Sequence, residues 1–278
     1  MKRISSIAFS LPDQYISELF TIAGRAALEA GNALRNLFQQ PYTIHFKDKF
    51  DLVTNADIAS EEIILTLLDA EQNGTKVLAE ESRALYDEPP LEAVWIVDPL
   101  DGTTNFVHGL PWFAVSIAYL DKGKCEIGII YAPMQDELFC ACRGQGAWLN
   151  GESIRVSEVA DLSQALLATG FPCDVHLHPE PVLGALENLL IHSQGIRRGG
   201  AAALDLAAVA CGRLDGFWEI KLKPWDTAAG KLLVEEAGGK VTDFNNEIYS
   251  PFVPEIACSN GRIHDQIIKQ LRAYSNNS

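Results

Sequence analysis

The sequence predicts an α+β fold in which helices and sheets are stacked in layers. Three observations lead to this expectation: two helical segments come before the first strong strand, short apolar runs then end abruptly in carboxylates, and the second half alternates strand-like with helical segments. Elements that each have one apolar face must bury it against a neighbouring layer. The 278 residues, 47% of them hydrophobic, suffice for one large domain or two modest ones with a buried core.

The N-terminal helices follow from apolar residues at helical spacing. The first helix begins at Pro12-Asp13, and its pattern runs to Gln40, where Pro41 stops it. A second helix is expected over residues 58–70, and the turn at Asn73-Gly74 ends it.

Five short apolar runs predict the strands of a first sheet. They cover residues 76–79, 93–97, 112–120, 125–131 and 137–142. The first two runs end directly in acidic residues, as buried strands do that deliver carboxylates to the edge of a sheet. We therefore expect a sheet covered by helices, with acids at its strand ends.

Turn-forming residues concentrate between Gly144 and Ser157, which predicts a boundary between two halves of the chain, residues 1–150 and residues 151–278. The second half is expected to be layered α/β. Its expected strands cover residues 165–169 and 217–220, and its expected helices cover residues 182–191, 201–211, 226–237 and 263–273.

Charge and composition exclude several classes of protein. With 37 acidic and 22 basic residues, the net charge of -15 argues against binding to the phosphate backbone of a nucleic acid. The acidity fits a protein that binds cations, although solubility alone also explains it. The six cysteines include no C-x-x-C pair, so neither a zinc site nor a disulfide framework is indicated.

Neither a secretory signal nor a membrane span is expected. Asp13 and Glu18 interrupt the N-terminal segment before the apolar core of a signal sequence forms. No apolar stretch approaches the roughly 20 residues that span a bilayer. A cytoplasmic location without membrane contact is the resulting expectation.

The segment from Asp98 to Asn105, which follows a buried strand, concentrates groups that bind cations and phosphate. Carboxylates at Asp98 and Asp101 can converge on one point, and Mg²⁺ prefers oxygen ligands such as carboxylates and carbonyls. With the Leu100 carbonyl turned inward, these groups predict a magnesium pocket in which Asp98 can bridge two ions. Gly102 leaves room for a phosphate, to which its own amide and that of Thr103 can donate.

Each acidic segment, taken alone, also fits a structural role. The D-P-x-D-G pattern is common turn material, Glu80-Glu81 fits a solvated turn, Asp226 fits a helix N-cap, and Glu219 fits an exposed acid at a strand end. Glu80 follows one apolar strand, however, and Asp226 opens a helix. Acids presented from separate elements in this way favour one shared site.

Four motifs in this order closely resemble the inositol monophosphatase family. They are Asp51-Leu52-Val53-Thr54-Asn55-Ala56-Asp57, Glu80-Glu81-Ser82, Asp98-Pro99-Leu100-Asp101-Gly102-Thr103-Thr104-Asn105 and Trp225-Asp226-Thr227-Ala228-Ala229-Gly230. The resemblance implies a layered αβαβα sandwich of the inositol monophosphatase and sugar phosphatase type. It also implies a magnesium-dependent, lithium-sensitive phosphatase that forms a homodimer.

The resemblance further implies two or three Mg²⁺ ions in each active site. Glu80, Asp98 and the Leu100 carbonyl would hold one ion, Asp98, Asp101 and Asp226 would hold a second, and a weaker third ion would lie near Glu80. The half before residue 150 would thus carry most metal ligands, and the half after it would complete the metal and substrate site.

The reaction implied by the resemblance is in-line attack of a metal-activated water on phosphorus. Thr103 and Glu80 would orient and deprotonate this water. Asp57 is counted with them as a catalytic residue but would lie in the outer shell of the site. Substrate contacts are expected from phosphate-binding and polyol-binding residues: Glu80, Leu100, Asp101, Gly102, Thr103, Gly200, Ala201, Ala202, Glu219 and Asp226. Arg197-Arg198 fits either attraction of an anionic substrate or a solvated turn.

The most favoured substrate is inositol-1-phosphate, as a representative of small phosphorylated polyols and sugars. Ala201 stands where many members of the family carry a hydroxyl residue, and Lys223 stands where the animal enzymes have histidine, so the polyol pocket differs. Histidinol phosphate, fructose 1,6-bisphosphate and 3′-phosphoadenosine 5′-phosphate are alternatives that relatives handle.

The alternative of another class is a metal-binding regulatory module, for example one that contacts the transcription machinery. The intact set of acids argues against it, because clustered carboxylates destabilise a fold without metal.

Overall fold

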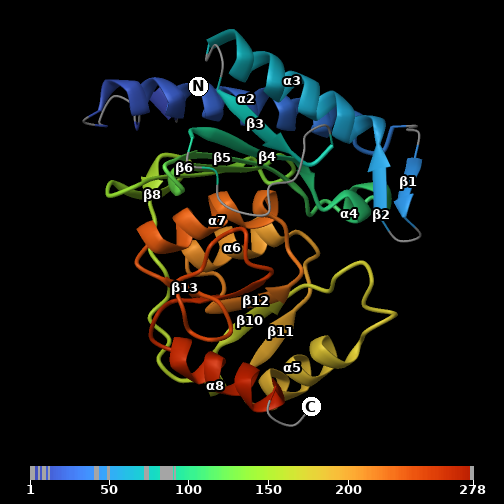
Figure 1. Cartoon of the computed structure of the whole chain (residues 1–278), viewed down its shortest axis with the longest axis vertical. Coiled ribbons are helices and arrows are strands. Elements are labelled where there is room, and N and C mark those ends of the chain that lie inside the picture. Colours follow the sequence, from blue (N-terminus) through green and yellow to red (C-terminus); the bar gives the residue numbers. More distant parts are fainter. Residues whose placement is uncertain are drawn as a thin grey trace.

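The chain folds into five alternating layers of helix and sheet, which confirms the expected αβαβα sandwich (Figure 1). The structure, a computed structural model, describes residues 4, 5, 7, 11, 13–40, 44–48, 51–71, 75–81, 90 and 92–275. In the view of Figure 1 the layers follow from top to bottom as α2 with α3, a seven-stranded sheet, α6 with α7, a five-stranded sheet, and α5 with α8. Within the described ranges, no helix is long and apolar enough to cross a membrane.

The first layer consists of α2 (Gln14–Leu37) and α3 (Asn55–Glu71). The Asp13 side chain caps α2 by accepting a hydrogen bond of 3.1 Å from the Ile16 amide. The helix ends three residues before the expected Gln40, and α3 begins three residues before the expected start at residue 58. Between these helices lies a hairpin that the sequence analysis did not expect, formed by β1 (Ile44–Asp48) and β2 (Asp51–Thr54).

The seven-stranded sheet has the order β3-β4-β5-β6-β7-β8-β9. Only β3 and β4 pair in parallel, and the other neighbours are antiparallel. Its strands are β3 (Lys76–Ala79), β4 (Val94–Asp101), β5 (Ala114–Asp121), β6 (Lys124–Ala132), β7 (Glu137–Cys142), β8 (Gly146–Leu149) and β9 (Glu152–Ser153). Strands β8 and β9 occupy the turn-rich region in which a boundary was expected, so this region continues the sheet.

One expectation about this sheet was wrong. Asp98 and Asp101 were expected in a loop after the strand, but β4 continues through both of them. Asp98 still pairs with Ser116 of β5, and Asp101 still pairs with Ala114. Between these two pairs β4 advances by three residues and β5 by only two. The extra residue of β4 forms a β-bulge. Both carboxylates therefore start from a paired strand and not from a turn.

The middle layer consists of α6 (Ala202–Ala210) and α7 (Pro224–Glu236), each within two residues of its expected start. These helices share one hydrophobic core with the seven-stranded sheet, in which Leu206 and Leu233 join Ile96 of β4. At Gly128 of β6 an added Cβ atom would lie 2.7 Å from the Ala229 carbonyl oxygen of α7, so glycine allows the close approach. The division at residue 150 stays a prediction.

The second sheet has the order β11-β10-β12-β14-β13, with β10, β11 and β12 parallel and the other pairs antiparallel. Its strands are β10 (Leu166–Thr169), β11 (Gly195–Arg197), β12 (Gly216–Ile220), β13 (Lys240–Thr242) and β14 (Glu255–Ser259). On its outer face lie α5 (Glu180–Leu190) and α8 (His264–Ser275). The carboxyl ends of β10 and β12 meet at one edge, as parallel strands require, and this edge faces the starts of α6 and α7.

Candidate active site

Acidic residues from four separate elements or their ends meet at one pocket between the two sheets. Glu80 directly follows β3, Asp101 ends β4, Glu219 lies near the end of β12, and Asp226 lies in the first turn of α7. The pocket has a volume of ≈ 190 Å³. It is lined by Leu52, Glu80, Asp101, Gly102, Thr103, Thr104, Gly170, Phe171, Cys173, Arg198, Gly200, Ala201, Ala202, Glu219, Leu222 and Asp226.

The pocket thus brings together most of the site residues expected from the sequence. Asp57, Asp98 and Leu100 do not line it, because they are 0%, 2% and 1% exposed. They belong to the same region, since Asp98 and Leu100 lie in the bulge that carries Asp101, and Asp57 contacts Thr103.

The bulge of β4 is held by hydrogen bonds within it and from α3. The Leu100 amide donates to Asp98 Oδ1 over 3.0 Å, and the Ser60 hydroxyl of α3 donates to the Pro99 carbonyl over 2.6 Å. Ser60 was not expected in this role, because nothing in its local sequence marks a bond to a residue so far along the chain. The bonds orient the buried Asp98 carboxylate and fix the path of the Leu100 carbonyl.

Two of the acids are fixed by backbone amides at helix starts. The Ala203 amide of α6 donates to Asp101 Oδ2 over 2.8 Å, and the Lys223 amide donates to Asp226 Oδ2 over 2.7 Å. The Asp226 carboxylate thus makes one half of a capping box, while the Asp226 amide donates to the Lys223 backbone carbonyl. The N-cap alternative for the Asp226 segment is therefore partly correct: Asp226 lies in the first turn, and its carboxylate caps the helix while lining the pocket.

Burial makes ionisation of these acids costly. Desolvation raises the pKa of Asp98 well above its ordinary value, and the charges of Glu80, Asp101 and Asp226 raise it further. Desolvation likewise raises the pKa of Asp101 and of Asp226 to about 7, against the hydrogen bonds from the backbone amides that lower both values. A cation in the pocket would favour the ionised forms.

A hydrogen-bonded pair of polar side chains, half-buried Thr103 and buried Asp57, lies beside the acids. The Thr103 hydroxyl is 2.9 Å from Asp57 Oδ1 and 3.1 Å from the Leu100 carbonyl oxygen, and it can donate to either. Asp57 Oδ2 also accepts bonds from the Thr54 amide at 2.8 Å and the Thr54 hydroxyl at 2.6 Å. Burial still raises the pKa of Asp57, since desolvation outweighs these bonds. The pair fixes the orientation of a hydroxyl at the pocket wall.

The loop at Gly102 is connected to the loop before α6. Gly102 has a positive φ of 94°, and an added Cβ atom would lie 3.0 Å from the Trp112 carbonyl oxygen. The Asn105 side-chain amide donates to the carbonyl oxygens of Trp112 at 2.7 Å and Gly199 at 3.0 Å. Asn105 closes the central motif and was not assigned a role from the sequence. Its bonds hold the two glycine-containing loops together at the pocket.

The opposite wall carries a buried acid and a cation. Burial raises the pKa of Glu219 well above its ordinary value, Asp226 and Asp205 raise it further, and the nearby Arg198 lowers it. The guanidinium carbon of Arg198 lies 5.4 Å from the ring centre of Phe171, which places it in a cation–π contact. Glu219 is 8% exposed, so the alternative of a freely exposed acid was wrong.

Several lining residues were missed by the sequence analysis. They are Leu52, Thr104, Gly170, Phe171, Cys173 and Leu222. Gly170 and Phe171 directly follow β10, and Leu222 follows β12. A usable signal did exist for these three, because residues after the carboxyl ends of neighbouring parallel strands commonly line a ligand site.

As the side chains stand, no three Asp, Glu, His or Cys residues in the described part of the chain form a group that could hold a metal ion. The residue types nevertheless fit Mg²⁺, because the pocket region offers carboxylate oxygens from separate elements, and among its described lining residues there is one thiol, Cys173, and no imidazole. The mutual repulsion that raises the pKa of Asp98 is also what a bound cation would relieve.

A five-layer αβαβα sandwich with an acid-lined pocket between its sheets defines the class of inositol and sugar phosphatases. The chain belongs to the inositol monophosphatase family, whose pattern matches residues 16–276. Family membership supports a phosphatase activity that acts on small phosphorylated compounds and depends on a metal ion. The family expected from the four sequence motifs is therefore confirmed.

Individual relatives carry two kinds of name. Nus factor SuhB of Escherichia coli K12 is 42% identical over 256 residues, which cover 91% of this chain and 96% of that protein. The structure of the extragenic suppressor protein suhB of Bartonella henselae has a TM-score of 0.86 at 41% identity, covering 91% of this chain and 98% of that one. Inositol monophosphatase of Anabaena has a TM-score of 0.82 at 41% identity, covering 91% and 94%.

Proposed function

We propose that the protein hydrolyses a small phosphate monoester in a Mg²⁺-dependent reaction, with inositol-1-phosphate as the favoured substrate. The observation that carries this proposal is the convergence of carboxylates with raised pKa values on a small pocket, beside the Thr103 hydroxyl that Asp57 orients. Such a cluster is costly to the fold unless cations are bound, and cations bound there would in turn attract an anionic substrate.

Two or three Mg²⁺ ions would occupy the pocket region. Glu80, Asp98 and the Leu100 carbonyl would hold one, Asp98, Asp101 and Asp226 would hold a second, and a third would lie near Glu80. Rotation of the side chains would be required to bring these oxygens together. When bound, Mg²⁺ would neutralise phosphate charge and lower the pKa of water.

The residues of the chain would position the reactants. The Thr103 hydroxyl, held by Asp57, would orient the attacking water, and the Glu80 carboxylate would accept its proton. Backbone amides at Gly102 and Thr103 would donate to the phosphate oxygens. The hydroxyls of the substrate would contact residues on the other side of the pocket, namely Gly200, Ala201, Ala202, Glu219 and Asp226.

The size and charge of the pocket favour a small monoester over the larger alternatives. Its ≈ 190 Å³ is below the roughly 300–1,000 Å³ typical of ligand pockets. Arg198 is the one cation among its lining residues in the described part of the chain, and it faces the buried acids Asp205 and Glu219. A second phosphate, as in fructose 1,6-bisphosphate or 3′-phosphoadenosine 5′-phosphate, would thus meet carboxylates that disfavour it.

Phosphate release from a panel of esters tests the proposal. The panel holds inositol-1-phosphate, histidinol phosphate, fructose 1,6-bisphosphate and 3′-phosphoadenosine 5′-phosphate, each with Mg²⁺ and with a chelator. We expect release that requires Mg²⁺ and is fastest with inositol-1-phosphate. Preference for another ester would keep the reaction and change the substrate, whereas no release from any ester would contradict hydrolysis.

The Thr103 hydroxyl provides a sharper test of the catalytic arrangement. Thr103→Val removes the hydroxyl at nearly constant volume, so we expect kcat to fall by about 10²–10⁴-fold, the range for a lost proton-transfer or orienting group. Thr103→Ser keeps the hydroxyl and the bond to Asp57, so it should retain most of the activity. Equal kcat values for the two variants in steady-state assays would exclude a role for the hydroxyl.

A second candidate function is binding to a protein partner alongside catalysis. The observation that favours it is the name Nus factor given to the 42% identical relative. The net charge of -15 disfavours direct contact with nucleic acid, so a protein partner fits better. A pull-down with a catalytically inactive variant separates the two functions, because partner capture should persist without turnover.

Lithium sensitivity, a homodimer and a cytoplasmic location also stay predictions.

A further inference from the structure

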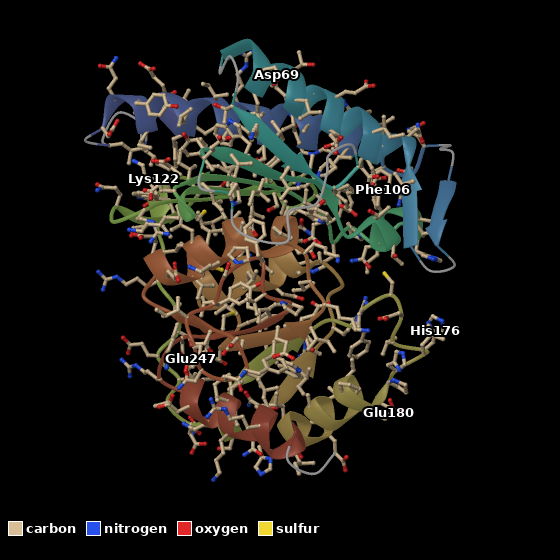
Figure 2. All side chains as sticks on the ribbon, in the orientation of Figure 1. Asp69, Phe106, Lys122, His176, Glu180 and Glu247 are labelled. Carbon is tan, nitrogen blue, oxygen red and sulfur yellow. The ribbon has the colours of Figure 1, made fainter. Side chains whose placement is uncertain are left out.

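A second cavity, larger than the first, lies at the other end of α7. It has a volume of ≈ 500 Å³ and is bounded by the β5–β6 turn, the second half of α7 and the segment 248–251. Its lining residues are Leu120, Gly123, Lys124, Cys125, Arg143, Lys231, Glu235, Ile248, Tyr249, Ser250 and Pro251. In Figure 2, Lys122 and Glu247, which adjoin this cavity in sequence, lie at the left of the view, whereas Phe106, which directly follows the active-site motif, lies at the right.

The charge of this cavity is opposite to that of the whole chain. Three cations, Lys124, Arg143 and Lys231, line it against one acid, Glu235, although the net charge of the protein is -15. A cluster of positive groups in a hollow of an acidic protein is a local potential well for anions. The active-site pocket has the reverse composition, so its side chains attract cations, whereas the side chains of this cavity attract an anion directly.

The cations are held in place by their present contacts. Lys231 Nζ lies 2.6 Å from Glu235 Oε1, and its side chain is only 11% exposed. Arg143 Nε donates to the Cys125 carbonyl over 2.7 Å and lies 3.4 Å from Glu126 Oε1, so this cation is also paired with an acid. No ion pair is recorded for Lys124 within the described ranges, and its side chain is exposed at the mouth of the cavity. An anion in the cavity would therefore share Lys231 with Glu235 and Arg143 with Glu126, whereas Lys124 could turn toward it alone.

The remaining wall of the cavity is apolar. Leu120, Tyr249 and Pro251 contribute to it, and Ile248 is 91% exposed at its edge. An exposed large apolar side chain beside a hollow indicates a surface that a ligand can cover. The volume is within the roughly 300–1,000 Å³ of small-molecule pockets. We propose that this cavity binds a small organic anion, in which a carboxylate, sulfonate or phosphate is attached to an apolar or ring-shaped body.

Ligand binding here would reach the active site through α7. The Tyr249 hydroxyl donates to Thr227 Oγ1 over 3.0 Å, and Thr227 directly follows Asp226 in the first turn of the helix. Lys231 lies on the same helix, which packs closely on β6 at Gly128. Release of Lys231 from Glu235 by an anion, or a shift of Tyr249, would therefore act on the element that positions Asp226. This effect on turnover rests on the proposed hydrolysis, whereas the binding site does not.

Binding of 1-naphthalenesulfonate to the full chain tests the site. This probe joins a ring system to an anion and cannot be hydrolysed by a phosphatase. We expect saturable binding in a fluorescence titration, weakened about tenfold by Lys124→Gln and by Lys231→Gln, because each removes a charge-assisted contact. Lys269→Gln makes the same change on α8 beside a different cavity and should leave the affinity unchanged. The exposed position of Lys124 keeps the test valid if Lys231→Gln disturbs folding.

The outcomes separate the site from the proposed hydrolysis. Equal affinities in all variants, or equally tight binding of the uncharged 1-naphthalenemethanol, would overturn the anion site. An acidic peptide that binds the cavity at a lower concentration than the probe, and displaces it, would indicate that the ligand is a protein segment. This result would overturn the proposed ligand class. Probe binding without phosphate release from any ester would keep the site and refute only hydrolysis. A change in kcat or in the Mg²⁺ dependence at saturating probe, absent in Lys124→Gln, would support coupling through α7.

Discussion

Replacing Asp98 by Asn is expected to abolish Mg²⁺-dependent hydrolysis while the fold remains intact. Asp98 is 2% exposed, lies in the bulge of β4, and is the acid whose pKa is raised by burial and then by the three other acids of the cluster. In the proposed arrangement it would bridge two ions, so the loss of its charge would weaken both sites at once. We expect kcat to fall by about 10³-fold or more in phosphate-release assays.

The fold should tolerate this change because asparagine has the shape of aspartate. The asparagine side-chain oxygen can still accept the bond that the Leu100 amide donates. Burying a neutral amide also costs less than burying a carboxylate, so the metal-free variant should unfold at the temperature of the metal-free wild type or above it. Asp161→Asn is the matched control, since Asp161 caps a short helix far along the chain and asparagine caps equally well. Normal turnover in Asp98→Asn would refute the proposed metal site.

The layers of the fold could be predicted because their signals are local and repeated. The capping side chain of Asp13 and the apolar period over α2 both agree with the structure. Strands β1, β2, β8, β9, β11, β13 and β14 were missed, and most of them have no more than four residues. Strands this short carry little periodicity, and their existence depends on pairing with distant segments, as β13 and β14 do with each other and with β12.

The acids that gather at the pocket could be predicted because they lie in four motifs whose order along the chain is recognisable. The contacts that hold these acids in position could not be predicted. The bulge that presents Asp98 and Asp101 depends on the register of β4 against β5 and on Ser60 of α3. The bond between Thr103 and Asp57 likewise joins residues 46 positions apart. Such contacts form only when the layers assemble. The sequence motifs indicate which acids gather at the pocket, and the packing determines how each of them is oriented.

Removing Mg²⁺ is expected to make stability fall as the pH rises from 6 to 8. The folded-state pKa of Asp101 and of Asp226 is about 7, above the ordinary value of 3.8. Between these values the folded protein binds more protons than the unfolded chain, so the free energy of unfolding decreases with rising pH. Stability is therefore greatest when both acids are protonated and is lost as the pH rises through about 7.

The size of this effect follows from proton linkage. Each of the two acids would lower the free energy of unfolding by on the order of 1 kcal/mol between pH 6 and 8. His264 opposes them, because burial lowers its pKa to about 4. Near pH 6 the unfolded chain alone gains from protonating this histidine, and that gain disappears by pH 8, which offsets part of the loss. The net loss is on the order of 1–2 kcal/mol, or about 2–8 °C in melting temperature. Burial shifts Asp98, Asp205 and Glu219 in the same direction as the two acids and adds to the loss.

Thermal unfolding at pH 6, 7 and 8, in chelator and in saturating Mg²⁺, measures this linkage. With Mg²⁺ bound, the ionised acids would be paired with a cation, so the fall in stability should disappear or reverse. The double variant Asp101→Asn with Asp226→Asn cannot release these protons and should show a much weaker fall in chelator. A metal-free wild type whose melting temperature does not fall from pH 6 to 8 would contradict the electrostatic cost assigned to the cluster. Since that cost is the physical argument for a cation in the pocket, the proposed metal dependence would then lose its structural basis.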